Sequence, residues 1–283
     1  MTEFTEVADG VFVLVYPTLR VNCTLITGET GALLVDTLST GGQARELAAA
    51  AARITAKPLG LVNTHFHFDH CLGNATLAGA ATPIWGHTEC VRELRDNGAA
   101  WQRAWEQELL AEDEPLAREV GRTPIVPPNR PVGRRDVVDV GGRTVVLDWH
   151  GRGHTAGDLV VTTGSVVVAG DLVEEGAPPA FGDAFPLEWP ETLASLARAV
   201  PADALIVPGH GELVDPEFLG IAHEELAALD WLIREAHGDG ADVAKVAAAS
   251  SLARWGGPGL REAELAVRRG YAQLDAATAN TLG

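Results

Sequence analysis

The sequence predicts an α/β protein in which two β-sheets pack face to face and helices cover their outer sides. One observation is the order of the elements: strands followed by a helix in the first third, and strands followed by a helix again after about residue 144. A second is the composition. With 46% hydrophobic and 21% charged residues, the chain has an ordinary globular content, which excludes a disordered protein.

The first third of the chain predicts four strands and one helix. Apolar and β-branched runs indicate strands at residues 11–15, 22–27, 32–35 and 59–62. Residues 43–54 are rich in alanine and contain no glycine, which favours a helix. The strand at 59–62 leads directly into a histidine-rich segment.

The middle of the chain differs from the segments on either side. Residues 101–120 have a helical composition with many charges, whereas residues 123–135 are rich in proline, glycine and arginine and predict an irregular segment. Long irregular connections in compact domains are usually functional lids or disordered. We therefore expect residues 93–135 to form an insertion over one face of the sandwich.

Strands resume after the insertion, and they are expected at residues 144–149, 159–163, 165–169 and 204–207. The tripeptide Thr163-Gly164-Ser165 predicts a hairpin between two of them. Residues 191–200 predict a helix with Pro190 in its first turn. From residue 216 onward the composition is helical, with a break at residues 255–259.

These elements predict a single domain over residues 1–283. The core sandwich would occupy residues 1–215, and residues 216–283 would form a helical extension. A chain of 283 residues is long for one domain, but layered α/β domains reach about 250 residues.

The charge balance limits the partners of the protein. The chain has 21 Lys and Arg against 39 Asp and Glu, a formal net charge of −18. This balance repels phosphate backbones and anionic membranes, so we expect a small-molecule substrate rather than nucleic acid or a membrane. No apolar run approaches the ~20 residues of a membrane span, and the acidic N-terminus lacks the basic segment of a secretory signal. A cytoplasmic location is therefore expected, with monomer and homodimer both left open.

Seven histidines and aspartates stand at or just past the ends of predicted strands. They are His65, His67, Asp69, His70, His154, Asp171 and His210. Because strand ends are held by a rigid sheet and face a shared crevice, such residues can converge from distant positions. Neutral imidazole and carboxylate groups suit zinc, and also iron or manganese. The sequence therefore predicts a metal site at one edge of the sheets.

The seven residues divide into two ligand sets. One ion would take His65, His67 and His154. A second ion would take Asp69, His70 and His210, and Asp171 could bridge the two ions and leave a position open for water. An adventitious metal patch is the competing interpretation, but matching ligands at four separated strand ends make chance a poor explanation. The remaining histidines are interpreted as ordinary surface or core residues: His87, His150, His223 and His237.

These residues resemble the motifs of the metallo-β-lactamase superfamily. His-x-His-x-Asp-His at residues 65–70 is its signature motif, and the other four motif positions are matched in order by Asp36, His154, Asp171 and His210. The resemblance covers about the first 215 residues. It implies an αββα four-layer sandwich with a dinuclear metal site, two zinc ions per chain, and Asp36 as a residue that orients the histidine loop without binding metal.

The resemblance also implies a reaction. A metal-bound hydroxide would attack a small carbonyl ester, thioester, lactone or amide, with Asp69 and Asp171 as the catalytic carboxylates. The ligand set is similar to that of glyoxalase II, although Asp158 stands where that enzyme usually has a second histidine. One alternative is a mononuclear iron oxidoreductase of the persulfide dioxygenase type. Others are weak β-lactamase activity and a non-catalytic binding protein.

Other motifs are rejected, and the aromatic residues stay undecided. The glycines at 151 and 153 precede two strands instead of the helix that a dinucleotide fingerprint requires. Cys71 is interpreted as a small packed residue. Phe66 and Phe68 are expected to pack beneath the site, and the loop 177–189 is expected to border it. A further set of aromatic residues lines a pocket or belongs to the core: Trp85, Trp101, Trp105, Phe181, Phe185 and Trp189.

Overall fold

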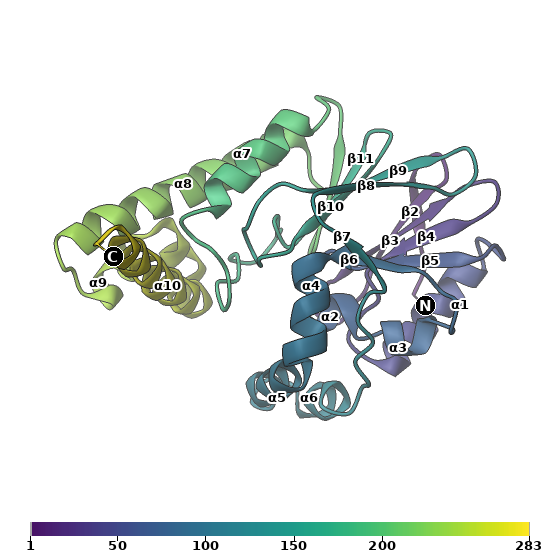
Figure 1. Cartoon of the computed structure of the whole chain (residues 1–283), viewed down its shortest axis with the longest axis horizontal. Coiled ribbons are helices and arrows are strands. Elements are labelled where there is room, and N and C mark those ends of the chain that lie inside the picture. The colour runs from purple at the N-terminus through teal and green to yellow at the C-terminus, as the bar shows by residue number, and fades with distance from the viewer. Residues whose placement is uncertain (1, 283) are drawn as a thin grey trace.

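The structure is a computed structural model that describes residues 2–282, and it confirms the predicted fold class. Within these residues two β-sheets occupy the centre of the molecule and helices lie outside them (Figure 1). The strand order is β1-β2-β3-β4-β5-β6-β7 in the first sheet and β12-β11-β10-β9-β8 in the second.

The first sheet is antiparallel from β1 to β4 and parallel from β4 to β7. Its strands are β1 (Thr5–Ala8), β2 (Val11–Val15), β3 (Asn22–Thr27), β4 (Ala32–Val35), β5 (Leu59–Val62), β6 (Ile84–His87) and β7 (Arg130–Val132). The parallel part places the ends of β4 and β5 side by side, which brings Asp36 next to the histidine-rich segment.

The second sheet is antiparallel except for the pair β11 and β12. Its strands are β8 (Arg135–Asp139), β9 (Thr144–Trp149), β10 (Leu159–Thr163), β11 (Val166–Gly170) and β12 (Leu205–Pro208). The predicted hairpin between β10 and β11 is confirmed. The parallel pairing of β11 with β12 brings the segments that carry Asp171 and His210 to the same edge.

Alternating side chains build the core between the sheets. In β4, Leu33 and Val35 belong to the cluster shared with the second sheet, whereas Ala32 and Leu34 belong to the cluster on the other face. Residues that alternate along a strand point to opposite faces, so this sheet is apolar on both sides. Leu47 of α1 (Gly41–Ala52) packs on the outer face.

The outer face of the second sheet is covered by α7 (Trp189–Ala199) and α8 (Pro216–Gly238). Val160 and Val167 of the sheet share one buried cluster with Leu193 of α7 and Leu226 of α8. The sequence order of strands and helices therefore produces the layers helix, sheet, sheet, helix. Pro190 lies in the first turn of α7, as predicted.

The segment 93–135 contains the helices that the composition of residues 101–120 predicts, and it differs from the prediction at the end of residues 123–135. Its first part is helical and continues from α4 (Thr88–Arg92) through the π-helix η1 (Glu93–Asn97) into α5 (Gly98–Leu109) and α6 (Glu114–Val120). Residues 123–129 form neither helix nor strand, as predicted, but residues 130–132 form β7, which pairs with β6 and completes the edge of the first sheet. These helices lie together on one side of the sheets (Figure 1).

Four strands escaped the sequence prediction, and three of them lie at sheet edges. β1, β7 and β8 carry charged residues or proline and are largely exposed, as edge strands often are. β6 has only four residues and contains Gly86, so its apolar signal is weak. The two short helices α2 (Phe68–Cys71) and α3 (Asn74–Leu77) follow the histidine-rich segment.

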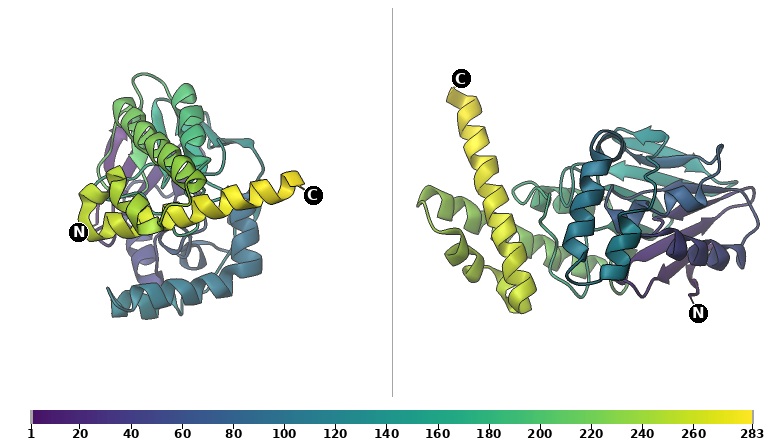
Figure 2. Two further views of the ribbon diagram at one scale, coloured as in Figure 1. Left: turned by 90° about the vertical axis from the view of Figure 1, so that its left-hand side faces the viewer. Right: turned by 90° about the horizontal axis from the view of Figure 1, so that it is seen from below.

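The C-terminal helices pack together beside the second sheet and share the cluster that covers its outer face. They are α8, α9 (Val243–Ala249), the 3₁₀ helix η2 (Ser251–Trp255) and α10 (Gly256–Leu282). Ala263, Ala266 and Val267 of α10 are buried in the same cluster as Leu193 of α7. The far end of α10 projects away from the sheets (Figure 2). Among residues 2–282, none of the helices combines the length and the apolar character that a membrane span needs.

Candidate metal centre

The histidine-rich segment begins where β5 ends and is held by backbone contacts to both halves of the molecule. The amide of Thr64 donates to Asp36 Oδ1 at 2.8 Å, and the amide of Leu159 in β10 donates to the carbonyl of Thr64 at 2.8 Å. Asn63 Nδ2 donates to the carbonyl of His70 at 3.0 Å. The segment is therefore held at both its start, Thr64, and its end, His70.

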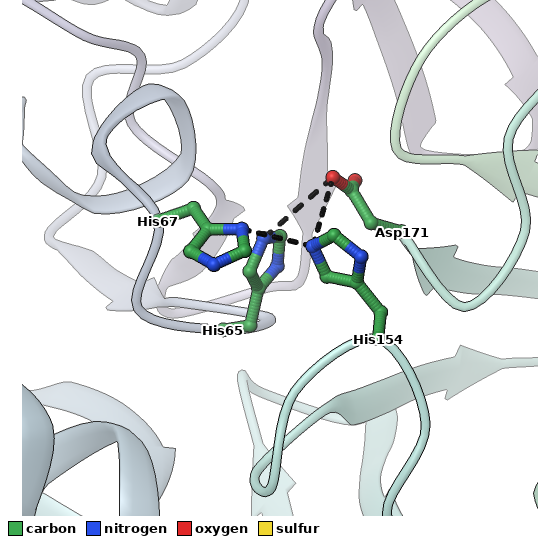
Figure 3. A group of neighbouring side chains, drawn as sticks. All are labelled: His65, His67, His154 and Asp171. Carbon is green, nitrogen blue, oxygen red and sulfur yellow. Dashed lines mark hydrogen bonds and ion pairs between the residues drawn. The ribbon is translucent and has the colours of Figure 1, made fainter. Parts of the chain in front are cut away.

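One set of ligand atoms comes from the two halves of the sandwich. It consists of His65, His67, His154 and Asp171, with one ligand atom from each lying within 4.8 Å of the others. Figure 3 shows the histidines and the carboxylate pointing toward one another. His154 Nε2 lies 2.8 Å from His67 Nδ1 and 3.5 Å from Asp171 Oδ2. The structure thus brings together the predicted ligands of the first ion.

A second set lies directly beside the first. It consists of Asp69, His70 and His210. Asp69 Oδ2 is 3.6 Å from His70 Nε2 and 3.4 Å from His210 Nε2. Asp171 also approaches this set, with 3.2 Å from Oδ1 to His70 Nε2 and 3.3 Å from Oδ2 to His210 Nε2. Asp171 therefore lies between the two sets, where a bridging ligand would have to be.

The local backbone around Asp171 makes this position available. Asp171 follows the last residue of β11, and Gly209 follows the last residue of β12. A Cβ atom at position 209 would collide with Asp171 Oδ1, so only glycine leaves room for the carboxylate. The parallel strands hold the two residues side by side.

The donor atoms fit a metal ion. His65 Nε2 and Asp171 Oδ1 are buried and have no hydrogen-bond partner within residues 2–282. Buried polar atoms are nearly always paired, so unpaired ligand atoms within these two sets indicate an ion. Imidazole nitrogens with carboxylate oxygens are the ligand types of zinc, and of iron and manganese.

Burial and neighbouring charges act in opposite directions on the histidines. Burial lowers the pKa of His65 well below its usual range and that of His154 to about 4, which keeps both rings neutral and able to bind metal. Burial also disfavours the charged form of His67 and His210. The Asp183 carboxylate nevertheless raises the pKa of His67 to about 9, and Asp171 raises that of His210 to about 10. The carboxylates thus favour positive charge here, which a divalent ion would supply in place of protons.

Asp36 orients His70. Its Oδ2 accepts from His70 Nδ1 at 2.8 Å and from Thr64 Oγ1 at 2.8 Å. Asp36 is 1% exposed and has a φ of 62°, a left-handed conformation that aspartate tolerates better than most residues. With Nδ1 bound in this way, His70 presents Nε2 to the site.

A second carboxylate, Asp183, orients His67, and the sequence analysis did not single it out. Its Oδ1 lies 3.0 Å from His67 Nε2, so the ring presents Nδ1 to the site. Arg269 of α10 holds the loop around Asp183 and donates to the carbonyl of Gly182 at 3.2 Å, to that of Asp183 at 2.7 Å and to that of Ala184. The expectation that the loop 177–189 borders the site is thereby met.

The site opens into a cleft of about 400 Å³. One wall is aromatic and comes from Phe68 of α2 and from Trp101 and Trp105 of α5. The opposite side includes Gly182 and Asp183 of the loop and Leu265 of α10. The helical part of the insertion and the C-terminal extension therefore both contribute to the cleft.

The remaining sequence interpretations divide between cleft and core. Phe66 is buried and packs against Trp101 with ring centroids 5.1 Å apart, as expected for a residue beneath the site. Phe181 and Trp189 are buried core residues and do not line the cleft. Cys71 is buried, and its Sγ donates to the carbonyl of Phe66 at 3.0 Å, which fits a packed residue. Asp158 accepts from the amide and hydroxyl of Thr155, so it closes a turn next to His154.

The comparison with protein families identifies the chain. The family model of the metallo-beta-lactamase superfamily matches residues 16–210. The chain belongs to this superfamily. The match ends at His210, so α8, α9 and α10 lie beyond it.

Solved structures of metallo-β-lactamases have the same fold. A metallo-beta-lactamase from Pontibacter korlensis is 20% identical, with a TM-score of 0.63 over 80% of this chain and 99% of that one. The metallo-beta-lactamase FIM-1 from Pseudomonas aeruginosa, in its mono-zinc form, is 19% identical, with a TM-score of 0.62 over 81% and 96%. A metallo-beta-lactamase from Hirschia baltica is 22% identical, with a TM-score of 0.58 over 79% and 96%. None of the curated proteins matches this chain.

Proposed function

We propose that this superfamily member is a dinuclear zinc-dependent hydrolase of a small carbonyl ester, thioester, lactone or amide. The observation that carries the proposal is the position of Asp171, whose two oxygens face both ligand sets. A single ion would need only one of these sets. The second set therefore supports two ions over the mononuclear iron alternative, which would use only His65, His154 and Asp171.

The ligand residues would divide the work in the way that their positions suggest. His65, His67 and His154 would hold one ion, and Asp69, His70 and His210 would hold the other, with Asp171 shared. Bound zinc supplies a water of lowered pKa at neutral pH and polarises a carbonyl oxygen. Asp69 and Asp171 are the proposed catalytic carboxylates, because both face the shared space between the two sets.

The rest of the chain would bind and orient the substrate. Phe68 and Trp105 provide an apolar wall that excludes water from one side of the cleft. No protein nucleophile is required. Burial raises the pKa of the Cys71 thiol well above its ordinary value, which leaves this neighbouring thiol unreactive.

The test is a substrate screen with zinc-loaded protein. Thioesters, lactones, aryl esters and β-lactams are offered, and hydrolysis should disappear on chelation and return with zinc. The variants Asp171→Ala and His70→Ala should lose activity by at least about a hundredfold, since a shared ligand and a wholly buried ligand cannot be replaced by water alone. His223→Ala in α8, outside both ligand sets, is the matched control. Full activity together with full metal content in His70→Ala would contradict the assignment.

A further inference from the structure

The lining of the cleft suggests which substrates this proposed hydrolase accepts. Apart from the metal ligands, its ionisable residues are all acidic: Glu108, Glu112, Glu174, Asp183 and Glu262. Within residues 2–282, no lysine or arginine lines the cleft. An anionic group on a substrate would therefore find no side-chain cation to pair with, and would lose its hydration without compensation.

Two of these carboxylates pair with a cation outside the cleft, whereas Glu108 and Glu174 have no ion-pair partner among the described residues. Arg261 Nη1 lies 3.6 Å from Glu112, and Arg261 Nε lies 3.5 Å from Glu262. Arg261 itself is not part of the lining. Glu108 stands on α5, one turn beyond Trp105, and no cation of the described chain pairs with it. The edge of the cleft beside the aromatic wall, which carries Glu108 and Glu112 and is called the rim below, thus keeps a negative charge.

The rest of the molecule adds to this local charge. The whole chain has a formal net charge of −18, which extends the negative potential beyond the rim. Two divalent ions would oppose it at the bottom of the cleft. Asp69, Asp171 and a hydroxide would offset three of their four positive charges, so about one positive charge would remain there against the carboxylates of the cleft.

The aromatic wall points to the shape and chemistry of the substrate body. Trp101 and Trp105 lie with ring centroids 6.2 Å apart and planes 20° from parallel, and Phe68 lies 5.9 Å from Trp105. Leu109 and Leu265 extend this apolar lining. Aromatic faces with carboxylates nearby accept apolar groups and organic cations, and they disfavour anions.

We propose that the cleft selects a neutral or cationic substrate with an apolar or aromatic body, and that it discriminates against anionic substrates. The nature of the cleaved bond rests on the proposed hydrolase function. The charge preference rests only on the acidic residues of the cleft.

The experiment uses three esters that differ only in charge. They are 4-nitrophenyl esters of 3-phenylpropanoic acid whose ring carries a para carboxamide, trimethylammonium or carboxylate group. With zinc-loaded full-length protein, kcat/KM for the neutral and cationic esters should exceed that for the carboxylate by about tenfold or more at low salt. The advantage of the cationic ester should shrink at 0.5 M salt, since rim charges are exposed to screening.

A variant without the two rim carboxylates tests whether they cause the charge preference. Glu108→Gln combined with Glu112→Gln should reduce the cationic-to-anionic ratio several-fold. The exposed Glu224 on α8 lies outside the cleft, so Glu224→Gln should leave the ratio unchanged. A carboxylate ester that is cleaved as fast as the neutral one, or a ratio that moves equally in the control, would overturn the proposal.

A binding measurement keeps this result separate from the hydrolase proposal. The same three ring substituents are offered on 4-phenylbutan-2-one, a ketone that has no ester or amide bond to hydrolyse. Binding is followed by tryptophan fluorescence, with Trp101→Phe as the reference. The neutral and cationic ketones should bind more tightly than the anionic one. If none of the esters is cleaved in a zinc-dependent way, the hydrolase proposal fails. The order of ketone binding then still supports or overturns the charge preference.

Discussion

His70 and His67 are each oriented by a carboxylate that contacts the ring nitrogen pointing away from the site, but the two carboxylates are held very differently. Asp36 stands at the end of β4, is almost fully buried and also binds Thr64. Asp183 stands on a loop before α7, is about 20% exposed, and its loop is held by Arg269 of α10. One side of the metal centre is thus part of the sheet, and the other depends on the C-terminal extension.

This difference shows how an extension outside the family match can matter for the metal centre. The match ends at residue 210, whereas Arg269 lies in α10. Coordination of His67 requires the ring to turn Nδ1 toward the site, which Asp183 secures. We therefore expect losses on the Asp36 side to damage folding, and losses on the Asp183 side to damage metal affinity with little effect on folding.

Asp36→Ala should have the largest effect. It would leave the amide of Thr64 and Nδ1 of His70 buried without an acceptor, whereas the hydroxyl of Thr64 would keep Nδ1 of His65 as a partner at 3.0 Å. At about 1 kcal/mol or more for each lost acceptor, the free energy of unfolding should fall by about 2 kcal/mol. Urea denaturation of the metal-free protein measures this directly. The free energy of unfolding should fall by less in Asp36→Asn, because asparagine keeps an acceptor for Thr64 and tolerates the positive φ. Equal free energies of unfolding for the alanine variant and the unaltered protein would contradict this role of Asp36.

Asp183→Ala should affect metal binding more than folding. Loss of a carboxylate partner of a histidine ligand typically weakens metal affinity about 10–100-fold. A partly exposed loop residue should change the free energy of unfolding by only about 0.5 kcal/mol. Competition with a chromophoric zinc chelator gives the affinity of each site. An affinity unchanged in the alanine variant would show that Asp183 does not orient His67.

Arg269→Met should have the smallest effect of the three, because it acts on His67 only through the loop. We expect zinc affinity to fall several-fold, with Arg269→Lys in between, since lysine cannot reach three carbonyls in a fork. Arg268→Met is the matched control, because Arg268 is exposed and pairs only with Glu264 at 3.5 Å among the described residues. Equal zinc affinities in the two methionine variants would show that Arg269 of the C-terminal extension does not support metal binding.

The sequence predicted the candidate metal ligands well but missed Asp183, one of the two carboxylates that orient them. The seven ligands follow buried strands with strong apolar signals, such as residues 32–35 and 59–62, and parallel strand ends must meet at one edge. Asp36 was found through the resemblance to the superfamily motifs, in which it follows a strand. Asp183 lies in a loop rich in glycine, proline and aromatic residues, and nothing local marks it as the partner of a histidine 116 positions away.

The fold shows the same division. The interior strands other than β6 were predicted to within one or two residues, because burial on both faces makes them continuously apolar. The edge strands β7 and β8 were missed, since their exposed residues can be charged or proline without cost to the core. Tertiary pairing, which a single sequence does not display, decides that residues 130–132 are a strand.

The measurement that tests the central claim most directly is the elemental metal content of the protein, purified without added metal, by plasma mass spectrometry. Two ligand sets that share Asp171 predict close to two zinc ions per chain. About one iron per chain would contradict the dinuclear zinc centre and favour oxygen-dependent sulfur chemistry instead. Protein that neither carries nor takes up a divalent ion would contradict the metal centre altogether.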